Sequence, residues 1–316
     1  MNNLLSSANP MQLVRRLSAQ DALILIKERG FQDSLEVLEL LSPDQVQNIF
    51  DLDVWDDDHI KTEAVEGWLE AMLEANPERA VQVFHELDPE FLSYLIKINT
   101  QVYELDDGQE PDGLSDERVR TPDNQYVVTF TQSIWRQFFE QFMARDLGFA
   151  LQIIQSVRFE TASGLEEEAL RWRDSRMQDL GFAPFAESKA ILGYINPDAP
   201  LPPANEGYDE NDEAGSSSAL LSYIKPKSLF QEALKNLSEQ SKARVLRELV
   251  STCNRVHIAM KRNPGEIEAL KETVTYVILM VEKALEYLSP DKLAQAPLAR
   301  LFQVGKALEV RGTICE

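Results

Sequence analysis

Apolar residues recur every three or four positions along most of this chain, the spacing of a helix that buries one face. The pattern is clearest between positions 81 and 98, where it runs through Val81, Phe84, Leu87, Phe91, Leu92, Leu95 and Ile98. Only a few residues separate one such run from the next. Short helices joined this closely pack as antiparallel hairpins, so the pattern predicts helical hairpins in series.

Several of these helical runs begin with the same N-terminal sequence pattern. A capping residue is followed by a proline at the first helical position and then by an acidic side chain. Proline fits there because its φ is already helical and its missing N–H would have been unpaired. The starts are Ser42-Pro43-Asp44, Asn76-Pro77-Glu78, Asp88-Pro89-Glu90 and Ser289-Pro290-Asp291. Their irregular spacing argues against a repeat of fixed length.

We therefore predict an all-α fold with three helical parts. Residues 1–105 are expected to form a helical-hairpin superhelix, residues 125–195 a middle helical segment, and residues 219–316 a C-terminal helical bundle.

Individual helices are predicted within the last two parts. In the middle segment they cover 133–146 and 147–159, and a capping box of Ser163 and Glu166 opens a third helix that stops at Gly181. The bundle helices are expected over 239–261, 266–288 and 290–310.

Two polar stretches connect the parts. Residues 106–124 are rich in Asp, Glu, Gly and Pro, which predicts a long acidic loop. The β-branched and aromatic residues that flank it at 102–105 and 126–131 predict one small β-hairpin, the only sheet expected. Residues 196–218 hold four prolines and six acidic side chains, no basic one, and then glycine and serine. That composition is typical of a flexible acidic linker.

The formal net charge of −22 is concentrated toward the front of the chain. Residues 1–100 carry −12, residues 101–126 carry −6 and residues 198–213 carry −6, whereas residues 214–316 carry +4. A surface this acidic repels phosphate backbones, so we expect no nucleic-acid partner. The mildly basic last part is expected to be a solvated helical face, or to dock on the acidic front.

The sequence also carries information on cellular compartment and membrane insertion. No apolar run approaches the roughly 20 residues needed to cross a bilayer, and the first ten residues lack the basic and apolar regions of a secretory signal. Cys253 and Cys315 are the only cysteines and lie far apart, which argues against a disulfide framework or a thiolate zinc site. We expect a cytoplasmic protein with reduced thiols and no membrane insertion.

The densest polar cluster lies between positions 51 and 59. Its candidate metal ligands are Asp51, Asp53, Asp56, Asp57 and Asp58. Oxygen-rich clusters suit Mg²⁺ or Ca²⁺, although the glycine and final glutamate of an EF-hand loop are missing. The structural alternative is that Asp58 caps a helix that runs through Trp68. Docking of a partner on the cluster is a third interpretation.

A second group combines arginine with tryptophan inside residues 165–181. The candidate partner-binding residues are Arg171, Trp172, Arg173 and Arg176. Such a group can bind an anion or an acidic partner. The alternative is a helix that pairs its own charges, Glu167 with Arg171 four positions on, and buries Trp172.

Motifs for catalysis are missing from the sequence. It contains no phosphate-binding glycine loop, nucleophile elbow or kinase motif. His59, His85 and His257 never lie four positions from another ligand on one helical face, so no zinc site is expected. We predict no catalytic residues, and no cofactor other than Mg²⁺ or Ca²⁺ at the acidic cluster.

Residues 25–38, 42–55 and 165–185 together resemble an uncharacterised bacterial family, a domain of unknown function. The resemblance covers most of the chain and implies no activity. The starts Asn76-Pro77-Glu78 and Asp88-Pro89-Glu90 are also similar to the cytosolic N-terminal superhelical domain of the MgtE-type magnesium transporters. That likeness implies a superhelical fold and a response to Mg²⁺.

Three functions follow as hypotheses. The first is a non-enzymatic interaction or scaffold protein that binds a protein partner. The alternative is a divalent-cation-responsive regulatory domain that uses the acidic cluster between Asp51 and Asp58. An enzyme of unrecognised type would need a polar pocket that no sequence motif indicates.

Overall fold

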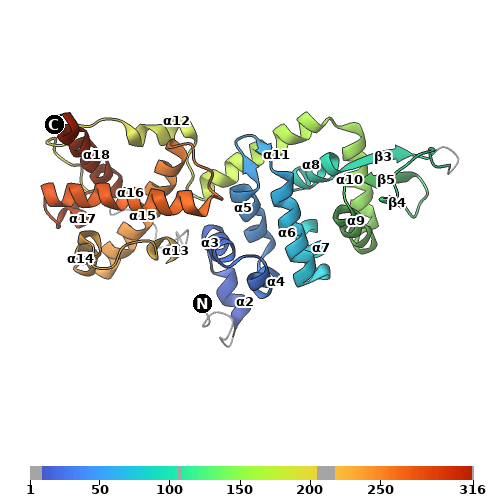
Figure 1. Ribbon diagram of the computed structural model, residues 1–316, viewed down its shortest axis with the longest axis horizontal. Coiled ribbons are helices and arrows are strands. Elements are labelled where there is room, and N and C mark those ends of the chain that lie inside the picture. Colours follow the sequence, from blue (N-terminus) through green and yellow to red (C-terminus); the bar gives the residue numbers. More distant parts are fainter. Residues whose placement is uncertain (1–8, 106–108, 205–217, 315–316) are drawn as a thin grey trace. The chain divides into compact units, whose positions relative to one another are not determined.

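The computed structural model describes residues 9–105, 109–204 and 218–314, and most of these are helical (Figure 1). The chain divides into two compact units: unit 1 contains residues 1–16 and 29–175, and unit 2 contains residues 17–28 and 176–316. Only two small antiparallel sheets occur within the described ranges. The mainly α-helical class is therefore confirmed, together with the small β element near residues 102–131.

Unit 1 contains short helices and all five described strands. Its helical elements are α2 (Pro10–Arg15), the 3₁₀ turn η1 (Gln32–Ser34), α4 (Leu35–Leu40), α5 (Pro43–Asp53), α6 (Thr62–Ala75), α7 (Pro77–His85), α8 (Pro89–Asn99), α9 (Ser133–Arg145), α10 (Leu147–Phe159) and most of α11 (Ala162–Asp179). Its strands are β1 (Trp55–Asp56), β2 (His59–Ile60), β3 (Thr100–Glu104), β4 (Arg118–Arg120) and β5 (Tyr126–Phe130).

Unit 2 is built around three long helices. Its elements are α3 (Ala19–Arg29), the end of α11, α12 (Phe185–Ser188), the 3₁₀ turn η2 (Lys189–Leu192), α13 (Ser218–Leu221), α14 (Leu229–Lys235), α15 (Glu239–Ala259), α16 (Ile267–Tyr287), α17 (Lys292–Gln295) and α18 (Leu298–Ile314). The division between the units falls within α11, between Ser175 and Arg176.

Three of the four predicted proline starts are confirmed in unit 1. The Ser42 hydroxyl accepts a hydrogen bond from the N–H of Gln45, whose side chain accepts one from the N–H of Ser42 in return. The side chains of Asn76 and Asp88 likewise accept backbone N–H groups at the starts of α7 and α8. These caps satisfy donors that the first turn of a helix cannot pair internally.

Two predicted helix boundaries were wrong. The helix expected over 290–310 is two helices, α17 and α18, because Pro297 has no N–H for a helical hydrogen bond and its ring would clash with the preceding turn. In α11 the capping group is the hydroxyl of Thr161, which accepts the N–H of Gly164, so Ser163 lies inside the helix. The predicted stop at Gly181 agrees with its positive φ of 83°.

The β elements exceed the single hairpin that was predicted. Strands β3 and β5 pair antiparallel with Val102 opposite Val128, and β4 adds a third strand from within the predicted loop. A second sheet joins β1 to β2 through Asp57, which adopts a left-handed φ of 50°. The expectation of one sheet was therefore wrong. Of the predicted loop and linker, residues 106–108 and 205–217 lie outside the described residues.

The core of unit 1 combines aromatic rings with buried carboxylates. The rings of Phe50 and Trp68 lie 6.2 Å apart, centroid to centroid, in an edge-on arrangement. The indole N–H of Trp68 donates to Asp53 at 2.7 Å, and that of Trp135 donates to Glu66 at 3.1 Å. Buried indoles need such acceptors. Part of the acidic charge in the first hundred residues therefore belongs to the interior.

The core of unit 2 includes a helix from the start of the sequence. Ile24 on α3 is buried in the same hydrophobic cluster as the inward faces of α15, α16 and α18. The side chain of Gln20 donates to Asn254 at 3.1 Å, and the carboxylate of Asp21 accepts the N–H of Ala219 at 3.0 Å. Residues 17–28 are thus an integral helix of this unit.

No helix in the described parts of the chain is long and apolar enough to span a lipid bilayer.

Helices α16 and α18 lie in very close contact at Gly305. A Cβ atom added at this glycine would lie 1.7 Å from the carbonyl oxygen of Met280 and 2.5 Å from its carbonyl carbon. Backbone atoms of a packed helix cannot yield as a flexible side chain does. Gly305 is therefore what allows the two helices to pack at this spacing.

We predict that Gly305→Ala destabilises the protein by about 3 kcal/mol, because the methyl group forces the helices apart. Gly312→Ala is the matched control, since it lies on the same helix with no atom within 4 Å of its added Cβ. It should be neutral or stabilising by up to about 1 kcal/mol, because alanine favours helix. Urea unfolding followed by circular dichroism measures both. Equal stability of the two variants would contradict the close packing.

Candidate functional site

The acidic segment of residues 51–58 and the arginine group of α11 meet in unit 1. Arg173 joins them: its Nε donates to the carbonyl oxygen of Asp51 at 3.0 Å, and its Nη1 donates to that of Asp57 at 3.2 Å. The guanidinium also lies 5.2 Å from the ring centroid of Trp55. A single arginine thus holds the end of α5 and the turn of the β1–β2 hairpin together.

The electrostatics around Arg173 suit this structural role. Burial lowers the pKa of the guanidinium, while the nearby carboxylates of Asp51, Asp174, Asp58 and Asp57 favour its charged form. An arginine remains protonated at neutral pH in either case. Its positive charge offsets part of the repulsion among these carboxylates, and its planar fork allows two carbonyls to be bound at once.

The five candidate metal ligands occupy different environments. Asp51 and Asp53 are fully buried. Asp53 accepts the indole N–H of Trp68, and a carboxylate oxygen of Asp51 lies 3.5 Å from the amide nitrogen of Gln47. The remaining candidates, Asp56, Asp57 and Asp58, are exposed on the β1–β2 hairpin. The buried and exposed carboxylates therefore do not form one continuous oxygen-lined site.

Helix capping by Asp58, the structural alternative, was wrong. Helix α6 begins at Thr62, and no side chain caps its first turn at Lys61. Asp58 lies in the hairpin turn instead, because β1 and β2 occupy the residues that were expected to begin the helix.

A metal centre is not preformed in the parts of the chain that the structure describes. Within them, no three Asp, Glu, His or Cys side chains are grouped so that they could hold a metal ion. Binding of Mg²⁺ or Ca²⁺ at the acidic cluster would require side chains to rearrange, and it stays a prediction.

A polar cluster that the sequence did not reveal lies beside the hairpin. Glu166 on α11 accepts a hydrogen bond from the hydroxyl of Tyr94 at 2.6 Å, and one of its oxygens lies 3.0 Å from Nδ1 of His59. The three residues are far apart in sequence and match no motif. No local spacing could have indicated that α8, α11 and β2 bring them together.

Each member of this cluster has a shifted pKa. The hydrogen bond and charge of Glu166 raise the pKa of His59, and burial together with Glu166 raises that of Tyr94. Burial also raises the pKa of Glu166, but hydrogen bonds from His59 and Tyr94 outweigh it and lower the pKa below its ordinary value. The cluster therefore favours an ionised Glu166 beside a protonated His59.

The predicted partner-binding group is divided by the fold. Arg173 is turned into the hairpin, whereas Trp172 is 46% exposed with the Arg171 guanidinium 5.7 Å from its ring centroid. Arg176 is partly buried and belongs to unit 2. Burial of Trp172, the structural alternative, was wrong. Arg171 and Trp172 remain the accessible members of the group.

Comparison with known proteins identifies the family of this chain. A model of a family of unknown function, DUF6178, matches residues 1–311. The chain belongs to this family. No match was found among curated proteins or among solved structures. Membership of the family confirms the expected relation to a domain of unknown function and adds no activity to it.

We predict that Arg173→Lys destabilises unit 1 by about 2 kcal/mol, because an ammonium cannot bind both carbonyls and stack on Trp55. Arg171→Lys is the control, and its exposed position should keep the change within about 0.5 kcal/mol. Urea unfolding with tryptophan fluorescence as the signal measures both. Equal effects of the two substitutions would mean that Arg173 does not organise the hairpin.

The His59–Glu166 pair predicts a pH dependence with a definite sign. Because the folded-state pKa of His59 is raised, its contribution to stability is complete below about 6.5, the unfolded value, and is lost as the pH rises through the folded pKa. The contribution of Glu166 is present above its unfolded pKa and is lost as the pH falls through its lowered folded value.

NMR titration of the His59 imidazole tests this prediction. We expect a pKa above the ordinary histidine value in the wild type and a fall toward that value in Glu166→Gln. Tyr94→Phe leaves the carboxylate in place, so the pKa of His59 should stay raised in that control. An ordinary pKa in the wild type would contradict the pairing.

Proposed function

We propose that this protein is a non-enzymatic interaction or scaffold protein that binds another protein through unit 2. The observation that supports the proposal best is a set of exposed apolar side chains where α16 and α18 pack together. We call this the α16–α18 surface and define it by Leu279, Tyr287 and Val310. Their side chains are 46%, 50% and 44% exposed.

Helical geometry places the two α16 side chains on one side of that helix, about 12 Å apart along its axis. Leu279 and Tyr287 are eight positions apart on α16, or two successive steps of four residues. Residues four positions apart are neighbours on a helix surface, so the two side chains lie on the same side of α16. Lys283 lies between them and pairs with Glu309 of α18 at 2.7 Å. That pair joins this side of α16 to the stretch of α18 next to Val310 in sequence.

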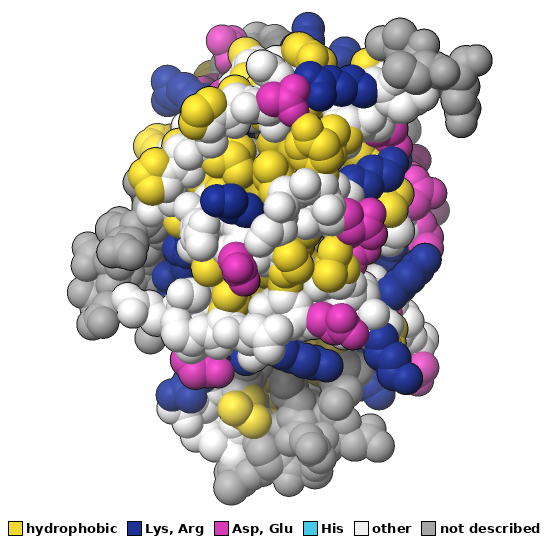
Figure 2. All heavy atoms as spheres, turned by 90° about the vertical axis from the view of Figure 1, so that its left-hand side faces the viewer, with side chains coloured by type: hydrophobic (Ala, Val, Ile, Leu, Met, Phe, Trp, Pro, Cys, Tyr) yellow, Lys and Arg dark blue, Asp and Glu magenta, His cyan; other side chains and the backbone are white. Residues whose placement is uncertain are grey.

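Polar groups surround the apolar positions. The hydroxyl of Tyr287 donates to Asp198 at 2.5 Å, and Asp198 also pairs with Arg311 of α18 at 2.8 Å. Figure 2 views one face of this unit, on which hydrophobic side chains gather among Lys, Arg, Asp and Glu. An apolar centre with a polar rim is the usual anatomy of a protein–protein interface.

The proposed partner is a protein with complementary apolar side chains. Nucleic acid is disfavoured by the net charge of −22. We place the interaction in the cytoplasm, in keeping with a chain of only two cysteines, of which Cys253 is a buried free thiol. A bacterial source and the likeness to the MgtE N-terminal domain also stay proposals, since they rest on sequence resemblance alone.

Site-specific crosslinking tests the proposed function. A photo-reactive amino acid placed at Leu279 should capture one reproducible protein in cells that naturally produce the chain, identified by mass spectrometry. Tyr287→Ser in the same protein should reduce the yield about tenfold, since aromatic side chains dominate many interfaces.

Met260 provides the matched control. It is 39% exposed in the same unit, but at the end of α15 rather than on the α16–α18 surface. A photo-reactive residue at Met260 should not capture that protein, and Met260→Ser should leave the capture through Leu279 unchanged. Equal capture from both positions, or none from Leu279, would refute the proposal.

A further inference from the structure

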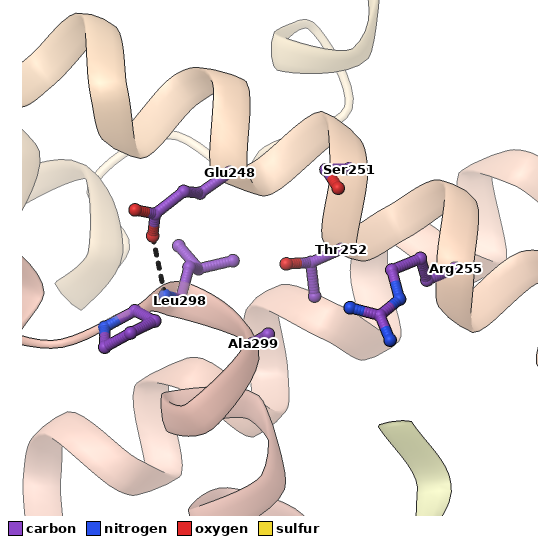
Figure 3. A pocket seen from close by; sticks show the side chains of 7 residues that line it. Glu248, Ser251, Thr252, Arg255, Leu298 and Ala299 are labelled. Carbon is purple, nitrogen blue, oxygen red and sulfur yellow. Dashed lines mark hydrogen bonds between the residues drawn. The ribbon is translucent and has the colours of Figure 1, made fainter. Parts of the chain in front are cut away.

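Unit 2 contains a cavity of about 160 Å³ between α15 and the beginning of α18 (Figure 3). Helix α15 contributes Glu248, Ser251, Thr252 and Arg255, and residues 297–299 close the other side. The four α15 residues follow the three-and-four spacing of one helical face, so their side chains are presented to the cavity together.

Arg255 is the unusual group in this cavity. Its Nε is buried and has no hydrogen-bond partner, and no ion pair or ring contact of the side chain occurs among the described residues. Figure 3 shows the guanidinium extending along the cavity beside Thr252. A buried cationic N–H without an acceptor is costly, and a negatively charged acceptor would remove that cost.

The carboxylate that lines the cavity does not serve as this acceptor. One oxygen of Glu248 lies 3.4 Å from Nη1 of Arg244, and the other accepts the N–H of Leu298 at 2.7 Å. Two helical turns separate Glu248 from Arg255, about 10 Å along the axis. The negative charge of Glu248 is therefore paired with Arg244. The guanidinium of Arg255 would need a negatively charged ligand as its acceptor.

Further donors face the same space. The hydroxyls of Ser251 and Thr252 line it, and among the residues drawn in Figure 3 the only hydrogen bond is the one from Leu298 to Glu248. Ala299 is the second residue of α18, and its N–H belongs to the first turn, where no helical acceptor exists. The positive end of the α18 dipole adds to the preference for a negative ligand.

We propose that this cavity binds a small oxyanion, a carboxylate or phosphate group, with Arg255 as its principal donor. A guanidinium binds two oxygens of such a group at once through parallel N–H donors. The hydroxyls of Ser251 and Thr252 satisfy further lone pairs of the anion. This site shares no residue with the α16–α18 surface, so this proposal does not depend on the proposed function.

Isothermal titration calorimetry on the full chain tests the site, with inorganic phosphate and acetate as separate probes at constant ionic strength. We expect saturable binding of at least one probe to the wild type. Arg255→Gln should weaken that binding by about tenfold or more, because the fork of donors is lost. Lys242→Gln removes the same charge from a half-buried position on the same helix, outside the cavity lining, and should leave binding unchanged.

The two probes distinguish the source of the oxyanion. Tight binding of phosphate without acetate assigns the site to a phosphate group, and binding of acetate without phosphate assigns it to a carboxylate. Comparable binding of both supports a general oxyanion site. Arg255→Lys keeps the charge without the fork and should bind more weakly than the wild type even if Arg255→Gln fails to fold. Absence of saturable binding to the wild type, or equal affinity of the wild type and Arg255→Lys, would overturn the proposal.

Discussion

Most helices of this protein are short and carry apolar side chains that must be buried, and the rest of the structure depends on how those side chains are covered. In unit 1 the helices cover one another with aromatic rings, such as Phe50 against Trp68. In unit 2 the approach is closer, because Gly305 places α18 against the backbone of α16 at Met280. The same requirement draws α3 from the start of the sequence into the core of unit 2.

The packing of these helices also determines where buried polar groups lie and what they bind. Asp53 serves as the acceptor for a buried indole, and Arg173 holds the backbone at Asp51 and Asp57. The acidic segment is thus shaped by packing, with its buried aspartates paired inside and its exposed ones on a hairpin turn. Its composition suggested cation chemistry, whereas its geometry shows a structural arrangement in which one arginine is central.

Local signals predicted the parts of the fold that local chemistry controls. The capping box at Ser42 and the cap at Asn76 were correct because the donor and acceptor lie within one turn of each other. The break at Pro297 was missed although proline gives a local signal, because the periodic pattern was extended through it. The β1–β2 hairpin was missed because two-residue strands leave almost no alternation to detect.

The candidate sites were predicted less completely, since they depend on contacts between distant residues. The sequence singled out Asp51 and Arg173 separately, but the two residues that form this contact lie 122 positions apart in the sequence. No sequence signal linked His59, Tyr94 and Glu166 to one another, and none indicated that Arg255 lacks a partner among the described residues. The exposure of Trp172 could not be predicted from the sequence either. Helix α11 is polar on most sides, so its sequence pattern does not define which face is buried.

The proposed function requires the α16–α18 surface to be covered by a partner in the cell. Hydroxyl-radical footprinting measures this without knowledge of the partner, because oxidation follows the solvent exposure of each side chain. We predict that Tyr287 and Leu279 are oxidised several-fold less in intact cells than in the purified protein, whereas Met260 is oxidised equally in both. Equal oxidation of Tyr287 and Leu279 in the two settings would contradict the account.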